Sequence, residues 1–281
     1  MIFNILSEYQ PLKEVIIGST VNFTEGEKIN KAMKTYYGTE FSPKKTEIIK
    51  EYLFLEKILT THKVKVYKPQ PSKQIPQQLA PRDIGFVIKD TFIMSNMKWQ
   101  SRKKEISSIR PMLKQYKGKV IKTPSNVYLE GGNIVIDKKL IFIGIGLRTS
   151  KNAISFLQEK FKFFQVIPIF LNNKEEIIHL DAVFNIISSN SAIIYPQGLK
   201  NIPKQIKSYK LIRVSKEEKN NGACNVLSIN PKDLIIRNKL PSLKNTLTKM
   251  GFNCYETIWN ETKKTGTVGP RCATLPLARQ N

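Results

Sequence analysis

The stretch IVIDKKLIFIG, residues 134–144, decides the fold class that we expect for this chain. Two apolar runs rich in β-branched residues flank the pair Lys138-Lys139. Each run has the length of a strand, and a two-residue break between two strands is typical of a β-hairpin. The stretch therefore predicts two neighbouring antiparallel strands.

The same pattern recurs on both sides of this hairpin. Short apolar runs predict strands at residues 15–17, 64–67, 85–88, 91–94, 133–136, 140–143, 166–169, 192–195, 211–214, 226–229 and 234–236. Apolar residues at three- and four-residue spacing predict helices at residues 43–62, 102–116, 152–161 and 240–250. Ser150 and Pro241 suit the starts of the last two helices. Strand pair, helix and strand follow one another about every 50 residues, which indicates a ββαβ-like unit repeated around a centre.

Composition places the chain among globular proteins. It has 281 residues, of which 41% are hydrophobic and 24% charged. We find no low-complexity linker, so we expect one α/β domain over residues 1–281. No apolar run reaches the roughly 20 residues of a membrane helix, and the first residues do not resemble a signal peptide. We expect a cytoplasmic protein without a membrane partner.

A formal net charge of +24 is the strongest feature of the composition. Only eight of the 46 basic residues are arginine, although bidentate recognition of phosphates and bases favours arginine. The lysines are spread along the whole chain. We interpret them mainly as a solvated surface and do not expect nucleic acid as a partner, while an anionic partner of another kind stays open.

The three cysteines are Cys224, Cys254 and Cys272. They are too few for a disulfide framework, and their spacing does not suit a structural zinc site. Cys272 follows Gly269 and Pro270, so it is expected on a loop or at the start of a strand. A neighbouring Arg271 would favour the nucleophilic thiolate; the alternative is a buried, unreactive thiol.

The second candidate is His179, which lies two residues before Asp181. If this segment is extended, both side chains point to the same face and the carboxylate raises the pKa of the imidazole. A structural histidine is the alternative. The other histidine, His62, lies in a basic helical end and is expected at the surface.

Two further acids stand beside turn-forming residues. Asp83 follows Pro81, and Glu130 precedes the pair Gly131-Gly132, which allows close approach of a ligand to the backbone. Each acid could equally be a solvated turn residue. Together with His179 and Cys272, however, carboxylates suit a planar guanidinium cation, whose N–H groups they accept in a fork geometry.

Eight ordered segments resemble the superfamily of guanidino-modifying enzymes, which includes arginine deiminases, dimethylarginine hydrolases, agmatine deiminases and amidinotransferases. The segments are SEYQPLKEVIIGS, PRDIGFVI, MKWQSRKKE, LEGGNIVID, GIGLRTS, HLDAVFNII, GACNVLSI and GPRCATLPLAR, spread from residue 7 to residue 279. The resemblance implies a five-bladed pseudosymmetric α/β-propeller, the pentein fold, with ββαβ-like units around a central active site. It also implies chemistry without a metal or an organic cofactor.

The resemblance assigns roles residue by residue. It implies that Cys272 is the nucleophile and His179 the general acid and base. Asp83 and Glu130 would bind the substrate guanidinium, and Asp181 would bind it too or orient His179. Arg148 resembles an arginine that holds the carboxylate of the substrate.

Within the superfamily the motifs are mixed. The segments around residues 81–105 and 179–187 resemble amidinotransferases, whereas Glu130 resembles the hydrolases, since the transferases have Asp at this position. The ending GPRC…PL resembles arginine deiminases, yet Thr267 stands where that family has an arginine. We expect a hydrolase of arginine deiminase type, with an amidinotransferase as the alternative.

Three further questions stay open from the sequence. The substrate is expected to be a small arginine-like guanidino compound, but protein-bound arginine is an alternative. A homodimer is left open. A non-catalytic propeller that binds an anionic partner is the third interpretation.

Overall fold

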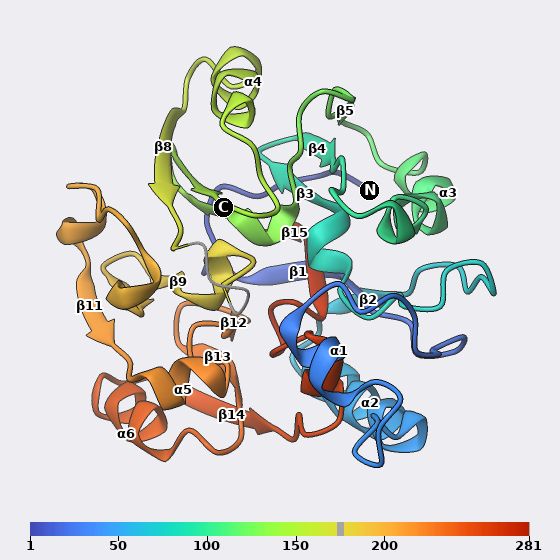
Figure 1. Ribbon diagram of the computed structural model, residues 1–281. Coiled ribbons are helices and arrows are strands. Elements are labelled where there is room, and N and C mark those ends of the chain that lie inside the picture. Colours follow the sequence, from blue (N-terminus) through green and yellow to red (C-terminus); the bar gives the residue numbers. More distant parts are fainter. Residues whose placement is uncertain (173–176, 281) are drawn as a thin grey trace.

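The fold is a ring of five three-stranded sheets, seen in a computed structural model that describes residues 1–172 and 177–280 (Figure 1). The longer helices α2 (Lys45–Thr61), α4 (Asn152–Lys160) and α6 (Pro241–Lys249) lie on the outside of this ring (Figure 1). The expected five-bladed α/β-propeller is confirmed.

The hairpin from which the fold was predicted forms one blade. Strands β6 (Ile134–Asp137) and β7 (Leu140–Ile145) pair antiparallel. Helix α4 then leads to β8 (Gln165–Phe170), which pairs parallel with β7. The blade is thus a ββαβ unit. Its turn begins at Lys138, whose φ of 55° lies in the left-handed region that lysine rarely adopts.

Three other blades repeat this order of two antiparallel strands and one parallel strand. The first consists of β3 (Gly85–Ile88), β4 (Thr91–Met94), α3 (Arg110–Leu113) and β5 (Lys119–Lys122). The second consists of β9 (Phe184–Ser188), β10 (Ser191–Ile194) and β11 (Lys210–Arg213), followed by α5 (Lys216–Asn220). The third consists of β12 (Leu227–Ser228), β13 (Asp233–Arg237), α6 and β14 (Asn253–Thr257).

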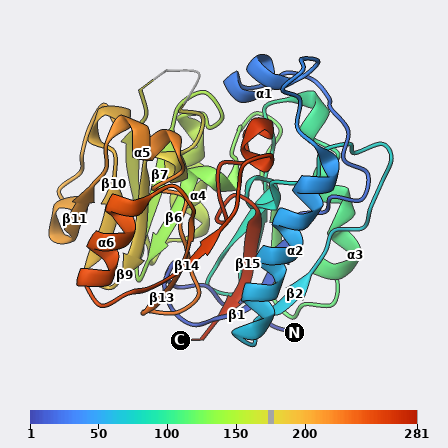
Figure 2. The same ribbon diagram turned by 90° about the horizontal axis from the view of Figure 1, so that it is seen from below.

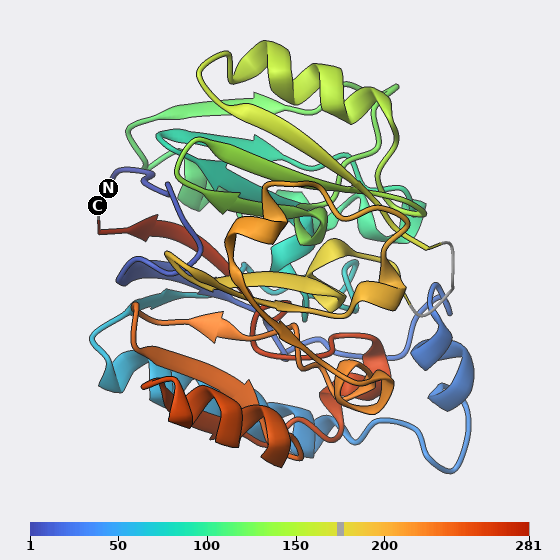
Figure 3. The same ribbon diagram turned by 90° about the vertical axis from the view of Figure 1, so that its left-hand side faces the viewer.

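The fifth blade joins the two ends of the chain and closes the ring. Strand β15 (Thr274–Arg279) pairs antiparallel with β1 (Leu12–Ile17), and β2 (Lys65–Tyr67) pairs parallel with β1 after α2. Figures 2 and 3 show both termini at one end of the ring, with α1 (Lys31–Tyr36) at the other end.

Some predicted elements differ from the structure. Strands β5, β9, β14 and β15 were not predicted, because polar residues or a proline interrupt their apolar pattern. The predicted helix at residues 102–116 is wrong: the chain forms short 3-10 turns and then α3. Pro111 in this segment lacks an N–H donor and its ring disfavours a continuous helix. Pro241 does start α6, whereas the hydroxyl of Ser150 bonds the backbone of Tyr128.

The burial of a strand depends on its position within the blade. Every residue of β3, β6 and β9 is buried, whereas the third strands β2, β5 and β11 are largely exposed or half-buried. The first strand of a blade therefore lies inside and the third lies at the rim. Within the described residues, no helix has the length and hydropathy needed to cross a bilayer.

Each inner strand begins after a turn, and these turns meet. The 3-10 turns Pro81–Ile84, Gly131–Asn133 and Leu180–Ala182 precede β3, β6 and β9, and the turn Gly131–Asn133 contacts the other two. Residues 223–226 and 269–273 precede β12 and β15 in the same way. The fivefold arrangement thus gathers segments that are far apart in sequence.

Closure of the ring by β15 predicts the cost of weakening that strand. We expect Leu277→Ala to lower the free energy of unfolding by about 2–5 kcal/mol, because Leu277 is fully buried. Leu53→Ala is the control, since Leu53 on α2 is 55% exposed and its loss should cost less than about 0.5 kcal/mol. Urea denaturation measures both, and equal losses would contradict the role of β15.

Candidate active site

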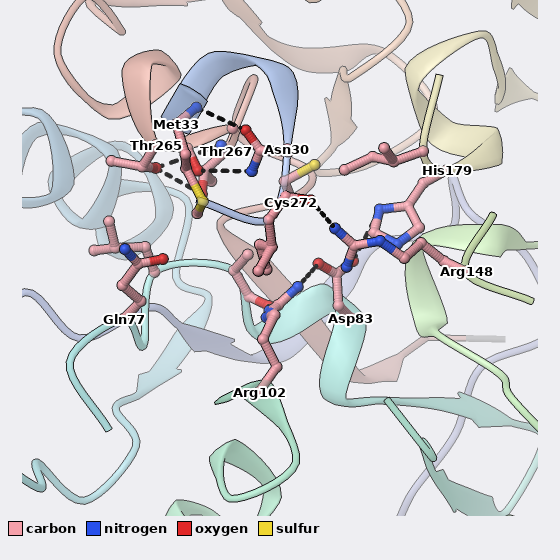
Figure 4. A pocket seen from close by; sticks show the side chains of 15 residues that line it. Asn30, Met33, Gln77, Asp83, Arg102, Arg148, His179, Thr265, Thr267 and Cys272 are labelled. Atoms are coloured by element: carbon pink, nitrogen blue, oxygen red, sulfur yellow. Dashed lines mark hydrogen bonds and ion pairs between the residues drawn. The ribbon is translucent and has the colours of Figure 1, made fainter. Parts of the chain in front are cut away.

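The turns before the inner strands bring all the predicted site residues together. Asp83, Glu130, His179, Asp181 and Cys272 are each at most 6% exposed. A cavity of about 40 Å³ is lined by Asp83, His179 and Cys272, together with Arg102 and Arg148 (Figure 4). A wider cavity of about 450 Å³ shares His179 and Cys272 and adds Asp181. The site is a narrow chamber with a broader space beside it.

His179 lies between two carboxylates. Its Nε2 is 2.7 Å from Glu130 Oε2, and its Nδ1 is 3.4 Å from Asp83 Oδ1. Burial lowers the pKa of His179, but the charges of Asp83 and Glu130 outweigh this and raise the pKa above its ordinary value. The imidazole is therefore poised to hold and release a proton.

Asp181 forms no direct bond to His179, although its charge helps to raise the pKa of the imidazole, as expected. Residues 180–182 form a 3-10 turn, so the segment is not an extended strand at this point. Asp181 Oδ2 instead lies 3.8 Å from Cys272 Sγ and 3.6 Å from Arg271 Nε. Of the two roles that were open for Asp181, orientation of the imidazole falls to Glu130.

Arginines of the chain itself compensate the buried acids. Arg102 Nη1 is 2.7 Å from Asp83 Oδ2 (Figure 4). The other side-chain nitrogens Nε and Nη2 of Arg102 bind both oxygens of Glu105. Arg148 Nη1 is 3.4 Å from Glu130 Oε2. Arg102 and Glu105 were not predicted as site residues, although both lie in the quoted segment MKWQSRKKE.

Two carboxylate oxygens are left over. Among the described residues, the buried atoms Asp83 Oδ1 and Asp181 Oδ1 have no hydrogen-bond partner, although Asp83 Oδ1 lies within ion-pair distance of His179 Nδ1, at 3.4 Å. A buried acceptor without a donor costs free energy, so such atoms are expected to receive donors from a ligand. Both belong to side chains that line the two cavities.

Cys272 is held by Asn225. The side-chain amide of Asn225 donates to Sγ at 3.0 Å and accepts the Cys272 backbone N–H at 2.9 Å. Burial raises the pKa of the thiol well above its ordinary value, and the nearby Asp181 and Asp83 raise it further. Asn225 was missed as a site residue, although it lies in the quoted segment GACNVLSI.

Arg271 interacts electrostatically with Cys272, as expected, but it does not make the thiolate the favoured form. Its guanidinium group is turned into a bidentate pair with Glu8 and also approaches Asp181. The negative charges near Sγ therefore dominate, and the thiol form is favoured in the unliganded protein.

The Gly131-Gly132 pair allows close packing of the turns themselves. A Cβ on Gly132 would lie 2.7 Å from Asp83 Oδ1 and 2.8 Å from His179 Cγ. A Cβ on Gly131 would lie 2.2 Å from the backbone oxygen of Arg82. The pair was expected to admit a ligand; in the structure it admits neighbouring protein groups.

Arg148 has two partners within the protein, Glu130 and the backbone of Ile29. Arg148 also donates to the backbone oxygen of Ile29 at 3.1 Å, so its expected role at a substrate carboxylate stays a prediction.

Asp83, Glu130 and His179 offer ligand atoms within 4.8 Å of one another, a spacing that also suits a metal ion. The two acids already face Arg102 and Arg148, which compete with a metal for them.

Comparison with known proteins agrees with this geometry. A family model described as N,N dimethylarginine dimethylhydrolase, eukaryotic, matches residues 20–277. The uncharacterized protein YkgA of Bacillus subtilis (strain 168) is 31% identical over 275 residues, which are 97% of this chain and 94% of that protein. An arginine deiminase of Listeria welshimeri is 25% identical over 195 residues; the matched region is about half of either chain, 54% and 48%.

Two solved structures share the fold over nearly their whole length. The amidinotransferase SxtG of Microseira wollei has a TM-score of 0.85 at 20% identity, covering 99% of this chain and 98% of that one. The N-terminal domain of ArgZ, a cyanobacterial arginine dihydrolase solved with its substrate, has a TM-score of 0.85 at 20% identity, covering 95% and 98%. At such identities the likeness shows the fold alone. Because the family model spans most of the chain, the protein belongs to the N,N dimethylarginine dimethylhydrolase family, within the superfamily of guanidino-modifying pentein enzymes.

Proposed function

We propose that the protein hydrolyses the guanidino group of a small arginine-like substrate through a covalent amidino intermediate on Cys272. The observation that carries this proposal is the pair of buried oxygens, Asp83 Oδ1 and Asp181 Oδ1, that lack donors among the described residues. A guanidinium group supplies several N–H donors in one plane, together with the positive charge that carboxylates require.

The two cavities suit the two parts of such a substrate. The chamber of about 40 Å³ between Asp83, His179 and Cys272 has room for a small planar head group. The adjoining space of about 450 Å³ would take the remainder of the molecule. Binding both parts would hold the guanidinium carbon beside Sγ and replace a bimolecular encounter by a local one.

Substrate binding would also activate the nucleophile. Asp181 and Asp83 contribute to the raised pKa of Cys272. A guanidinium cation between these acids offsets their charge, so the pKa of the thiol falls when the substrate binds. Thiolate would thus form mainly in the complex, where it can react.

The reaction then proceeds in two stages. Sγ loses its proton to solvent as the substrate binds and forms a bond to the guanidinium carbon, and one carbon–nitrogen bond breaks as protonated His179 gives its proton to the departing nitrogen. Ammonia or an amine leaves, and a thiouronium group remains on Cys272. His179 next accepts a proton from water, which attacks the same carbon; the sulfur–carbon bond breaks and a ureido product is released.

Transfer to an amine instead of water is the second candidate. The wider cavity reaches both His179 and Cys272, so an acceptor amine could approach the intermediate there. SxtG, which shares the fold, is an amidinotransferase. We prefer hydrolysis for two reasons. The matching family model and the similar protein of Listeria welshimeri are named for hydrolytic reactions, and the hydrolases of the superfamily resemble this chain in having Glu at position 130.

The decisive test uses arginine, Nω-methylated arginines and agmatine in ¹⁸O-labelled water, with and without glycine. Hydrolysis predicts a ureido product that carries the label whether or not glycine is present. Cys272→Ser should lose roughly 10³-fold or more in turnover, while Cys254→Ser, at a half-buried thiol outside the site, should not. A product that requires the amine and carries no label would show transfer instead.

The pKa of the nucleophile gives a second prediction. In the unliganded protein the thiol of Cys272 should titrate above 9.0, so its alkylation rate rises with pH through the neutral range. Asp181→Asn removes a negative charge 3.8 Å from Sγ, so the pKa should fall and alkylation at neutral pH should accelerate.

Ultraviolet absorbance of the thiolate, taken as the difference from Cys272→Ser, measures this pKa directly. Asp90→Asn, at an exposed position on the β3–β4 turn, is the control and should leave the titration unchanged. A thiol that already titrates below neutral pH in the unliganded protein would contradict activation by the substrate.

The Gly132 contact gives a third prediction. Gly132→Ala should lower kcat/KM by about 10²-fold, because the new Cβ displaces Asp83 and His179 from their positions. Gly26→Ala is the matched control, since its nearest neighbour would be a side-chain atom at 3.5 Å. Steady-state kinetics measures the loss of activity, and thermal melting shows whether the variant is still folded. Full activity of a folded Gly132→Ala variant would contradict the claim that close packing of the turns positions Asp83 and His179.

A further inference from the structure

A second charged cluster lies behind the nucleophile. It contains Arg82, Arg271, Arg279 and Glu8, none of them more than 5% exposed. Arg271 lies in the turn before β15, Arg279 is the last residue of β15, and Glu8 belongs to the N-terminal segment. The cluster therefore links the N-terminal segment to the last strand of the ring.

The carboxylate of this cluster accepts three hydrogen bonds, two on Oε1 and one on Oε2. Glu8 accepts hydrogen bonds from both terminal nitrogens of Arg271 and from the backbone N–H of Ile136. These bonds lower the pKa of Glu8 to about 2, although its burial opposes the shift. Glu8 is thus ionised and committed to Arg271.

The other two arginines are only partly satisfied. Arg82 Nε donates to the backbone oxygen of Arg271 at 3.3 Å, and Arg279 Nη1 donates to that of Gln10. Among the described residues, Arg82 Nη2, Arg279 Nε and Arg279 Nη2 are buried without a hydrogen-bond partner. All three leftover atoms are donors on cations.

Charge in the cluster is also out of balance. Three arginines face Glu8 and the nearby Asp181, so one positive charge is left over if both acids are ionised. Burial lowers the pKa of Arg279 to about 9 and that of Arg82 to about 10, and repulsion among the arginines adds to both shifts. Uncompensated buried charge of this kind is costly.

A small cavity joins the two arginines. It measures about 10 Å³, the space of one water-sized species. Arg82, Arg279 and Glu8 line it together with apolar residues, among them Phe86, Ile134 and Leu275. Its size excludes a carboxylate ligand or a phosphate, and its apolar walls offer a guest few acceptors.

We propose that this cavity binds one monatomic halide ion, such as chloride, between Arg82 and Arg279. A halide accepts several N–H donors and donates none, which matches the three leftover donors. Water has two protons of its own to place, and the one carboxylate in the described lining, Glu8, already accepts three hydrogen bonds and pairs its charge with Arg271. The ion also supplies the missing negative charge.

Binding at this position would brace the catalytic end of the ring. Arg82 belongs to the same turn as Asp83, and its backbone N–H lies 3.4 Å from the backbone oxygen of Cys272. An ion that holds Arg82 therefore stabilises the turn that carries Asp83, without touching the substrate. We expect halide binding to show first as thermal stability.

Crystals of the unmodified protein grown with bromide test the site directly. An anomalous peak in contact with Arg82 Nη2 and Arg279 Nη2 is the expected result. Absence of that peak, with a water or nothing in the cavity, would overturn the proposal. This measurement needs no variant and does not depend on the enzymatic reaction.

Thermal melting gives an independent readout. At equal ionic strength, Tm should be about 2–4 °C higher in sodium chloride than in sodium gluconate. Arg279→Gln should lose this difference, while Arg213→Gln, at an exposed arginine on β11, should keep it. Equal Tm values of the unmodified protein in the two salts would also refute the proposal.

Discussion

Compensation of buried carboxylates by arginines of the same chain is the constraint on which the centre of this molecule depends. Asp83, Glu130 and Asp181 are each buried, and each faces an arginine at 2.7–3.6 Å: Arg102, Arg148 and Arg271. Ion pairs of this kind keep acids charged inside a protein, where an unpaired carboxylate would be strongly destabilising. The arginines do not satisfy every carboxylate oxygen: one oxygen of Asp83 and one of Asp181 have no hydrogen-bond donor among the described residues. The proposed affinity for a guanidinium group follows from those two oxygens.

Much of the fold could be predicted because its units repeat. The hairpin of β6 and β7 is encoded locally, by two apolar runs and a short turn, and the same pattern identified six further inner or middle strands: β1, β3, β4, β10, β12 and β13. The rim strands β5 and β14 escaped because exposed strands need no apolar run: Lys119 and Asn253 face solvent. The break of the predicted helix depends on tertiary contacts as well, since Arg102 forms an ion pair with Asp83 in the turn before β3.

The residues of the candidate site could be predicted from the sequence better than the contacts between them. Residue types with distinctive chemistry, such as Cys272, His179 and Asp83, could be selected from sequence, and the turns of the ring do bring them together. Partnerships could not be predicted, because they depend on which turns adjoin. His179 was expected to pair with Asp181 but lies between Glu130 and Asp83, and Arg271 was expected beside the thiol but binds Glu8. Asn225 has a neutral amide and lies in no sequence pattern that indicates a site residue, although it makes a direct contact with Cys272 Sγ.

A crystal structure of Cys272→Ser with a guanidino substrate bound tests the central claim most directly. The account predicts that N–H groups of the substrate donate to Asp83 Oδ1 and Asp181 Oδ1, with the guanidinium carbon facing the side chain at position 272. Arg102 and Arg148 should keep their places behind the acids. A substrate bound elsewhere, with both of these oxygens still lacking donors, would contradict it.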